Sequence, residues 1–314
     1  MSDPSLLRAG IYGLLLGDAA GVPYEFQSPS SLAPFADRVD MVPPPGFRRT
    51  YASIAVGTWS DDGALALCLL ESLVERGEFD PVDQARRMVA WLDEGHLAVG
   101  GHVFDVGNTT REALGRARSL MEEGASPVGQ GSVDAWSAGN GTLMRILPLA
   151  LWHEGPDEEL ARLAAIHSAL THAHPACLAC CATYCLWARR LAEGVDRPFA
   201  LAFKQARGWL GGDPALAEAF DLIQAWRDKP PGGTGYVVDT LVSAGWALDG
   251  GGDFKDVIRR AILLGNDTDT TAAVAGGLAG LKFGLDGLPG DWLALLRGRD
   301  LVEPILAKAG RPRG

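Results

Sequence analysis

Apolar residues recur at helical spacing along almost the whole chain, and this period limits the possible folds more than any other feature. Apolar side chains at offsets of three and four predict helices separated by short Gly, Pro, Asp or Asn breaks. The predicted helices cover 5–20, 63–76, 81–94, 109–123, 142–153, 157–171, 175–193, 198–209, 214–227, 236–248, 253–264, 270–282 and 291–309. No extended region alternates with the period of two that a half-buried strand requires. We therefore expect an all-α fold.

The chain is expected to form one compact domain, an orthogonal helical bundle over residues 1–314. Its 314 residues would allow one large domain or two ordinary ones. No repeat of fixed period is present, and no linker is long enough to separate two domains. Residues 36–56 include a PPPG segment and look irregular, which predicts a surface loop near a site.

A stripe of small residues marks one predicted helix as central. Ala272, Gly276, Ala279 and Gly280 are spaced by three and four residues, so they share one helix face. Glycine within a helix costs roughly 1 kcal/mol relative to alanine. A run of such residues indicates that another backbone approaches closely. The helix that begins near Thr270 is therefore expected to be tightly surrounded.

The charge balance limits the classes of partner. The formal net charge is −11 and the pI is near 5.0, so broad binding to phosphate backbones is disfavoured. A small anionic ligand stays possible, because a cation or a helix N-terminus can make a site locally positive. The N-terminus lacks the pattern of a secretory signal, and no apolar stretch reaches the roughly 18 residues that span a bilayer. We expect a cytoplasmic protein with no membrane contact.

Four of the five cysteines crowd together, at Cys177, Cys180, Cys181 and Cys185. Cys177 and Cys180 have the Cys-x-x-Cys spacing of a metal site. The alternative is a buried helix face, because offsets of 3, 4 and 8 residues place all four thiols on one side. The flanking residues are apolar and no second Cys or His pair follows at zinc-ligand spacing. Buried thiols are the favoured interpretation.

Two acidic clusters precede predicted helices. Ser60, Asp61 and Asp62 come before the helical run 64–70, and residues 267–270 (DTDT) come before 272–275. Helix capping explains one Asp at each place, but it does not explain adjacent carboxylates beside a hydroxyl. Clustered carboxylates repel one another unless cations intervene. Oxygen ligands without Cys or His suit Mg²⁺, Mn²⁺ or Ca²⁺, and six side-chain oxygens suit two ions. Capping stays the competing interpretation.

Further motifs follow one another in a fixed order along the chain. They are residues 17–25 (GDAAGVPYE), 60–62 (SDD), 105–110 (DVGNTT), 137–145 (SAGNGTLMR), 170–175 (LTHAHP) and 265–270 (GNDTDT). This order resembles the ADP-ribosylglycohydrolase family, which includes the dinitrogenase reductase-activating glycohydrolase. The resemblance spans nearly the whole chain. At position 60 Thr is commoner in the family, and Ser60 is a conservative replacement.

The resemblance implies an all-α fold with a central dinuclear site for two Mg²⁺ (or Mn²⁺) ions. The implied metal ligands are Ser60, Asp61, Asp62, Asp267, Asp269 and Thr270. The implied catalytic residues are Glu25 and, through the metal, Asp62. Without the motif, Glu25 would be read as a solvated carboxylate after a turn. Asp105 is a further candidate, either for a ribose contact or for holding a metal ligand from outside.

Other motif residues are candidates for substrate binding. They are Asp105, Gly107, Asn108, Ser137, Gly139, Asn140, Gly141, His172 and Tyr236. Glycines at 139 and 141 would let backbone N–H groups approach a pyrophosphate at the start of the helix that contains Met144. His172 could hydrogen-bond a phosphate or a ribose hydroxyl. Tyr236 could stack on the adenine, or it could be a packing residue at a helix start.

The implied reaction is hydrolysis of the bond between C1″ of ADP-ribose and the group that it modifies. The substrate would be ADP-ribose or an ADP-ribosylated protein or small molecule, and an ADP-ribosylated nucleic-acid end stays open. The alternatives are a catalytically weak ADP-ribose-binding member of the same fold and a dinuclear-metal phosphodiesterase. Product analysis separates the enzymes, because a phosphodiesterase would release AMP.

Overall fold

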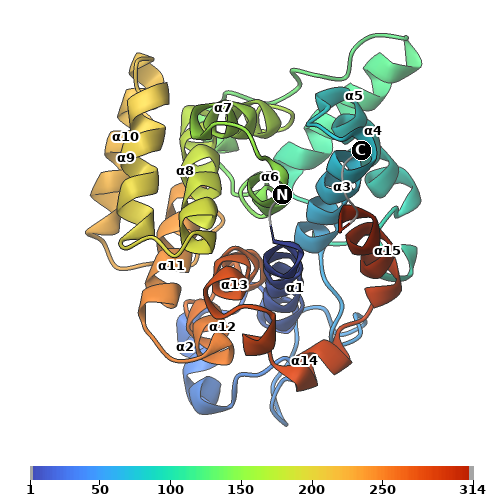
Figure 1. Ribbon diagram of the computed structural model, residues 1–314. Coiled ribbons are helices and arrows are strands. Elements are labelled where there is room, and N and C mark those ends of the chain that lie inside the picture. Colours follow the sequence, from blue (N-terminus) through green and yellow to red (C-terminus); the bar gives the residue numbers. More distant parts are fainter. Residues whose placement is uncertain (1–2, 311–314) are drawn as a thin grey trace.

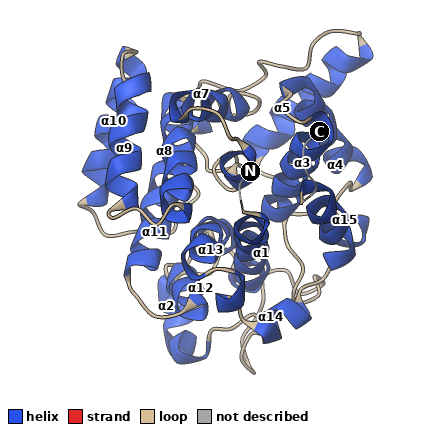
Figure 2. Cartoon of the chain, viewed as in Figure 1, coloured by secondary structure: helices blue, strands red, loops and turns tan. Residues whose placement is uncertain are grey.

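The computed structural model describes residues 3–310, and regular structure within them is helical (Figures 1 and 2). This confirms the all-α prediction. The helices are α1 (Pro4–Gly21), α2 (Pro29–Leu32), α3 (Asp61–Arg76), α4 (Pro81–Glu94), α5 (Asn108–Glu122), α6 (Leu147–Trp152), α7 (Asp157–Ser168), α8 (Pro175–Ala192), α9 (Pro198–Leu210), α10 (Pro214–Arg227), α11 (Val237–Asp249), α12 (Phe254–Leu263), α13 (Thr268–Phe283), α14 (Gly290–Leu295) and α15 (Arg299–Ala309). The division into one domain over 1–314 stays a prediction.

Helices α1 and α13 lie side by side at the centre of the molecule (Figure 1). Both are buried along most of their length, as expected for helices that are apolar on all sides. A Cβ atom added to Gly276 would lie 2.3 Å from the carbonyl oxygen of Gly13, and one added to Gly280 would lie 2.1 Å from that of Ala9. The predicted close approach of a second backbone is therefore confirmed, and α1 supplies it.

Two predicted helices differ from the structure. The segment 142–153 is helical only from Leu147, and before it the backbone N–H groups of Leu143 and Met144 donate to the carbonyl of Asn140 in a turn. Pro148 explains the late start, because proline has no N–H to donate within a helix and is favoured in the first turn. The segment 291–309 forms α14 and α15. Gly298, with a φ of 72°, separates them.

The four clustered cysteines lie on α8 with their thiols buried and unpaired, as predicted for a helix face. The predicted loop is also present. After a 3-10 turn at Ala33–Arg38, residues 39–60 run without regular structure, and the Thr50 hydroxyl donates to the carbonyl of Glu25. Across the described residues 3–310, we find no helix with the length and apolar character needed to cross a membrane.

Candidate functional site

The first acidic cluster begins α3, and a carboxylate from α1 caps this helix from outside. Asp18 is fully buried and accepts hydrogen bonds from the backbone N–H groups of Ser60 (2.9 Å) and Gly63 (2.8 Å). The Ser60 hydroxyl donates to Asp62 Oδ2 over 3.0 Å. Helix capping is therefore carried by Asp18 and Ser60, which leaves Asp61 and Asp62 for another role. Asp18 belongs to the sequence motif of residues 17–25, but nothing in the sequence indicated this capping role.

The second cluster begins α13, and again a distant carboxylate caps the helix. Glu25 follows the 3-10 turn Val22–Tyr24, and its Oε2 accepts from the backbone N–H groups of Thr268 (2.8 Å) and Asp269 (3.3 Å). Asp267 occupies the N-cap position, but its side chain accepts no capping hydrogen bond. Glu25 is thus neither solvated nor isolated, because it is buried against the start of α13.

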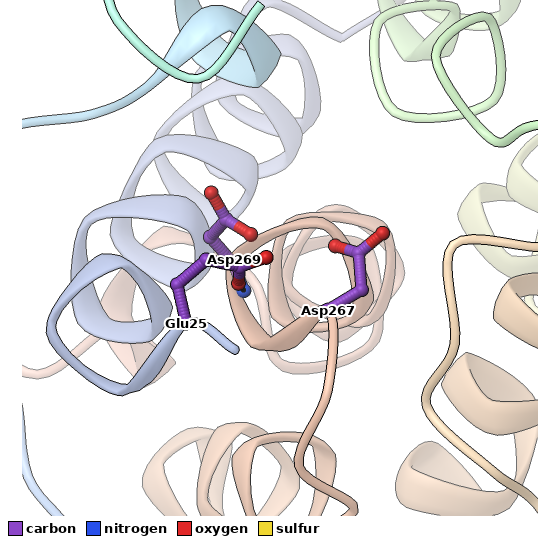
Figure 3. Close-up of side chains that lie close together, drawn as sticks. All are labelled: Glu25, Asp267 and Asp269. Carbon is purple, nitrogen blue, oxygen red and sulfur yellow. Dashed lines mark hydrogen bonds between the residues drawn. The ribbon is translucent and has the colours of Figure 1, made fainter. Parts of the chain in front are cut away.

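The two clusters meet. Thr270 Oγ1 lies 3.4 Å from Asp62 Oδ2, which joins the start of α13 to the start of α3. Ligand oxygens of Glu25, Asp267 and Asp269 all lie within 4.8 Å of one another. Figure 3 shows Asp267 and Asp269 at the start of α13, with Glu25 reaching them from the segment that follows α1. Residues separated by about 200 positions in sequence therefore form one acidic site.

The donor set fits a hard divalent cation. Asp62 Oδ1 and Asp269 Oδ2 are buried and have no hydrogen-bond partner among the described residues. Burial, together with neighbouring carboxylates, raises the pKa of Asp61, Asp62 and Asp269 well above the ordinary value. Unpaired buried carboxylates are costly, and a cation among them would both pair the oxygens and offset the repulsion. All the groups are oxygen ligands, which suit Mg²⁺, Mn²⁺ or Ca²⁺.

Above this acidic floor lies a cavity of about 380 Å³, which is within the usual size range for a small-molecule site. Eleven of the predicted site residues line it: Glu25, Asp61, Asp105, Gly107, Asn108, Gly139, Asn140, Gly141, His172, Asp267 and Thr270. Ser60, Asp62, Asp269, Ser137 and Tyr236 are not among its lining residues. Phe26 lines the cavity and was missed by sequence analysis. It directly follows Glu25, and its φ of 59° is unusual for a residue other than glycine.

The Gly139–Gly141 turn is hydrogen-bonded to both the acidic site and α11. The Asn140 side-chain amide donates to Asp267 Oδ2 (2.8 Å) and to Thr240 Oγ1 (2.9 Å), so it orients Asp267. The predicted helix start beside this turn is absent, because α6 begins only at Leu147. A pyrophosphate at this turn would therefore meet the N–H groups of a turn and not those of a helix N-terminus.

Asp105 lines the cavity and is held by Tyr51. Asp105 has a φ of 58°, and its carboxylate accepts a hydrogen bond of 2.6 Å from the Tyr51 hydroxyl. Tyr51 belongs to the irregular segment between α2 and α3, so the structure places part of the predicted loop beside the site. The Asp105 backbone conformation explains why this short motif turns sharply before α5 begins at Asn108.

Three other predicted substrate contacts have clear packing partners. His172 is buried, with Nδ1 2.8 Å from Thr171 Oγ1. Tyr236 packs its ring on Trp226 at a centroid distance of 5.2 Å, which agrees with the alternative role at a helix start. The Ser137 hydroxyl lies 2.8 Å from that of Ser132. The direct contacts of these residues with a substrate stay predictions.

Comparison with known proteins places this site in a family context. A protein-family model described as ADP-ribosylglycohydrolase matches residues 3–312. The chain is 34% identical to an ADP-ribosylarginine hydrolase of Pseudomonas putida, over 91% of this chain and 72% of the relative. It is 30% identical to the ADP-ribosyl-[dinitrogen reductase] glycohydrolase of Rhodospirillum rubrum, over 99% of both chains. A solved structure of an ADP-ribosylglycohydrolase-related protein complex superposes with a TM-score of 0.74 at 31% identity, covering 98% of this chain and 96% of that one.

Proposed function

Because the chain belongs to the ADP-ribosylglycohydrolase family, we propose that its acidic site is a divalent-cation centre for hydrolysis of the C1″ bond of an ADP-ribosylated substrate. The protein is a hydrolase of ADP-ribosyl bonds, as its relatives at 30–34% identity are named. The observation that carries the metal proposal is the meeting of two acidic clusters under a cavity, with buried carboxylate oxygens that lack a partner.

We assign the cation centre to the starts of α3 and α13. The proposed ligands of two Mg²⁺ (or Mn²⁺) ions are Ser60, Asp61, Asp62, Asp267, Asp269 and Thr270. Such ions, when bound, would act as Lewis acids toward the ribose hydroxyls and the attacking water. Glu25 lies close enough to Asp267 and Asp269 to join this ligand set. Asp18 and Asn140 would orient the ligands from outside it.

Glu25 is the proposed proton-transfer group. Cleavage of the ribosyl bond builds positive charge on C1″, and water must lose a proton as it adds there. Without bound cations, burial and the neighbouring Asp267 raise the pKa of Glu25 to about 8. Cations held by Asp267 and Asp269 would lower this pKa, so that near neutral pH the ionised carboxylate would accept the proton from water. Glu25 also lines the cavity, whereas Asp62 lies outside the lining. We therefore propose that Asp62 binds a cation and that Glu25 transfers the proton.

We propose that the preferred substrate is a protein ADP-ribosylated on arginine, and that the enzyme cleaves its N-glycosidic bond. Two relatives, from Pseudomonas putida and Serratia proteamaculans, are named ADP-ribosylarginine hydrolases. In this chain Glu25, Asp61 and Asp105 line the cavity, and their carboxyl groups suit a guanidinium leaving group. The net charge of −11 disfavours a nucleic-acid carrier.

A linkage panel tests this function. ADP-ribosylarginine, an ADP-ribosylserine peptide and an ADP-ribosylated DNA end are incubated with the protein and each metal, and the products are separated by chromatography. We expect free ADP-ribose, fastest from arginine, and loss of activity after chelation with recovery on adding Mg²⁺ or Mn²⁺. AMP as the product would favour the phosphodiesterase. ADP-ribose binding without turnover on any linkage would favour a binding protein, and full activity after exhaustive metal removal would contradict the cation centre.

Metal binding should also depend on pH in a defined direction. The pKa of Glu25 is about 8 in the folded chain, against an ordinary value of 4.5. Between these values the folded chain keeps a proton that the unfolded chain has released, so this contribution to stability is complete below pH 4.5 and lost as pH rises through about 8. Asp18, with a pKa of about 7, acts in the same direction.

Cations compete with these protons, so added Mg²⁺ or Mn²⁺ should raise Tm more at pH 8 than at pH 5. At a 1,000-fold excess over Kd the ion stabilises the fold by about 4 kcal/mol, or on the order of 8 °C in Tm for a chain of this size. Differential scanning calorimetry at the two pH values measures this. An equal shift at both, or none at either, would contradict the proposed coupling.

A further inference from the structure

A buried, positively charged side chain, that of Arg145, lies behind the Gly139–Gly141 turn and outside the acidic site. Arg145 is fully buried, and its guanidinium donates to the carbonyl of Gly141 (2.6 Å) and to the hydroxyl of Thr171 (2.7 Å). Both acceptors are uncharged, and Arg145 Nε has no partner among the described residues. Burial lowers the pKa of Arg145 to about 10, so it stays protonated at neutral pH. These two hydrogen bonds therefore supply no counter-charge, and the carboxylate that interacts with the charge of Arg145 is that of Asp61.

The Thr171 hydroxyl links this cation to His172. A threonine hydroxyl has one proton to donate, and an arginine can only donate. Thr171 Oγ1 accepts from Arg145 and lies 2.8 Å from His172 Nδ1. If Nδ1 carried a proton, Arg145 and His172 would both donate to Thr171 Oγ1. The proton of the buried Thr171 hydroxyl would then find no acceptor in either residue. The arrangement is complete when Thr171 donates to Nδ1 and the ring proton sits on Nε2.

The Nε2 edge of His172 faces the cavity. A Cβ atom added to Gly141 would lie 3.0 Å from His172 Cε1, and one added to Gly139 would lie 3.6 Å from Nε2. All three residues line the cavity. Glycines at these two positions therefore leave the Nε2 edge uncovered. The backbone of His172 is also held, because its carbonyl accepts from the Ser168 hydroxyl over 2.9 Å.

We propose that Arg145 and Thr171 are positioning residues that fix His172 as the neutral Nε2–H tautomer, so that Nε2 donates a hydrogen bond to an anionic diphosphate oxygen in the cavity. The identity of that anion rests on the proposed function. The tautomer rests on the Arg145–Thr171–His172 contacts alone.

The charge distribution supports an anion at this end of the cavity. The carboxylates lie at the starts of α3 and α13, whereas Arg145 lies behind the glycine turn. A diphosphate between the acidic site and Arg145 would be attracted by the positive charge of Arg145 and would accept a hydrogen bond from His172 Nε2. Burial and the charge of Arg145 lower the pKa of His172 to about 3, so the ring is a fixed donor and does not gain a second proton near neutral pH.

Nitrogen NMR of ring-labelled histidine tests the tautomer. The chain has six histidines, and the His172→Gln variant identifies the His172 signals by their loss. In the parent protein we expect a protonated Nε2 and an unprotonated Nδ1 that accepts a hydrogen bond. Thr171→Val should produce a mixture of tautomers, whereas Thr171→Ser, which keeps the hydroxyl, should retain the parent pattern. A protonated Nδ1 in the parent protein would overturn the proposal.

Calorimetric binding of ADP-ribose, at one fixed metal concentration, tests the consequence. We expect about 10-fold weaker binding for Thr171→Val and for His172→Leu, and a smaller loss for His172→Gln, whose amide can still donate. In the hydrolysis assay the loss should appear in KM with kcat little changed. Thr171→Val that binds like the parent despite a changed tautomer would overturn the proposal.

Two comparisons keep these outcomes separate from other failures. Melting curves and the Thr171→Ser variant show whether a loss reflects misfolding, since the serine protein should fold and bind like the parent. The NMR pattern needs neither substrate nor turnover. If no linkage is hydrolysed but the Nε2–H tautomer and its effect on ADP-ribose binding are found, the proposed function fails and this inference stands.

Discussion

Replacing Asp62 by asparagine is expected to lower kcat/KM for ADP-ribosyl hydrolysis by about 1,000-fold or more, equivalent to about 4 kcal/mol of transition-state stabilisation. Asp62 contacts Ser60 and Thr270, so it joins the two helix starts, and its Oδ1 has no partner among the described residues. The amide keeps the shape and removes the charge that would hold a cation. Steady-state kinetics and metal analysis of the purified variant measure the two losses together.

The stability of Asp62→Asn should change in the opposite sense. Burial and neighbouring carboxylates raise the pKa of Asp62. In protein from which a chelator has removed the metal, a neutral amide at this position therefore relieves repulsion. We expect its Tm without metal to be no lower than that of the parent, and its rise on adding Mg²⁺ or Mn²⁺ to be much smaller. Asp62→Asn with parental activity and metal content would show that the ligand assignment is wrong.

Asp157→Asn is a matched control for this substitution. Asp157 also lies in the first turn of a helix, α7, and pairs with Arg189 over 2.8 Å and with Arg190, but it is not in the acidic site. Its replacement should cost stability through the two weakened ion pairs and leave metal content unchanged. A loss of metal in Asp157→Asn as large as in Asp62→Asn would mean that charge removal acts through the fold and not through the site.

Replacing Gly280 by alanine is expected to destabilise the protein by about 3 kcal/mol or more. The new Cβ would lie 2.1 Å from the carbonyl oxygen of Ala9, which is backbone and cannot turn aside. Helices α1 and α13 would have to move apart, and this cost should exceed the roughly 1 kcal/mol that alanine gains over glycine in a helix. Urea unfolding measures the change in the free energy of unfolding.

Gly115→Ala provides the matched control. Gly115 lies within α5, and a Cβ atom added there would have no neighbour within 4 Å. The same substitution should therefore stabilise the chain by about 0.5–1 kcal/mol. If Gly280→Ala and Gly115→Ala changed the stability equally, the tight packing of α1 against α13 would be contradicted.

The helices were predictable because their apolar period is local information. The same locality explains the errors. The segment 142–153 has a helical pattern, but Pro148 and the turn at Asn140 shift the start of α6 to Leu147. The small-residue stripe of α13 was visible, whereas its partner was not, because pairing with α1 joins residues more than 250 positions apart.

The candidate site shows the same division. Both acidic clusters could be found by composition, but their alternative role as helix caps could be judged only in three dimensions. The structure answers this through Asp18 and Glu25, which reach from the α1 segment and take over much of the capping of α3 and α13. Phe26 had no sequence signal beyond its place after Glu25. Its position depends on a backbone hydrogen bond to Asn266, a partner far away in the sequence.

Anomalous diffraction from crystals soaked in Mn²⁺ would locate the cations themselves. Two manganese peaks are expected between the starts of α3 and α13, with ligand distances to Asp62 and Asp269 that suit carboxylate coordination, and these peaks should be lost in Asp62→Asn crystals. If the side chains are ordered in Mn²⁺-soaked crystals but no manganese peak contacts Asp62 or Asp269, the proposed cation centre is contradicted.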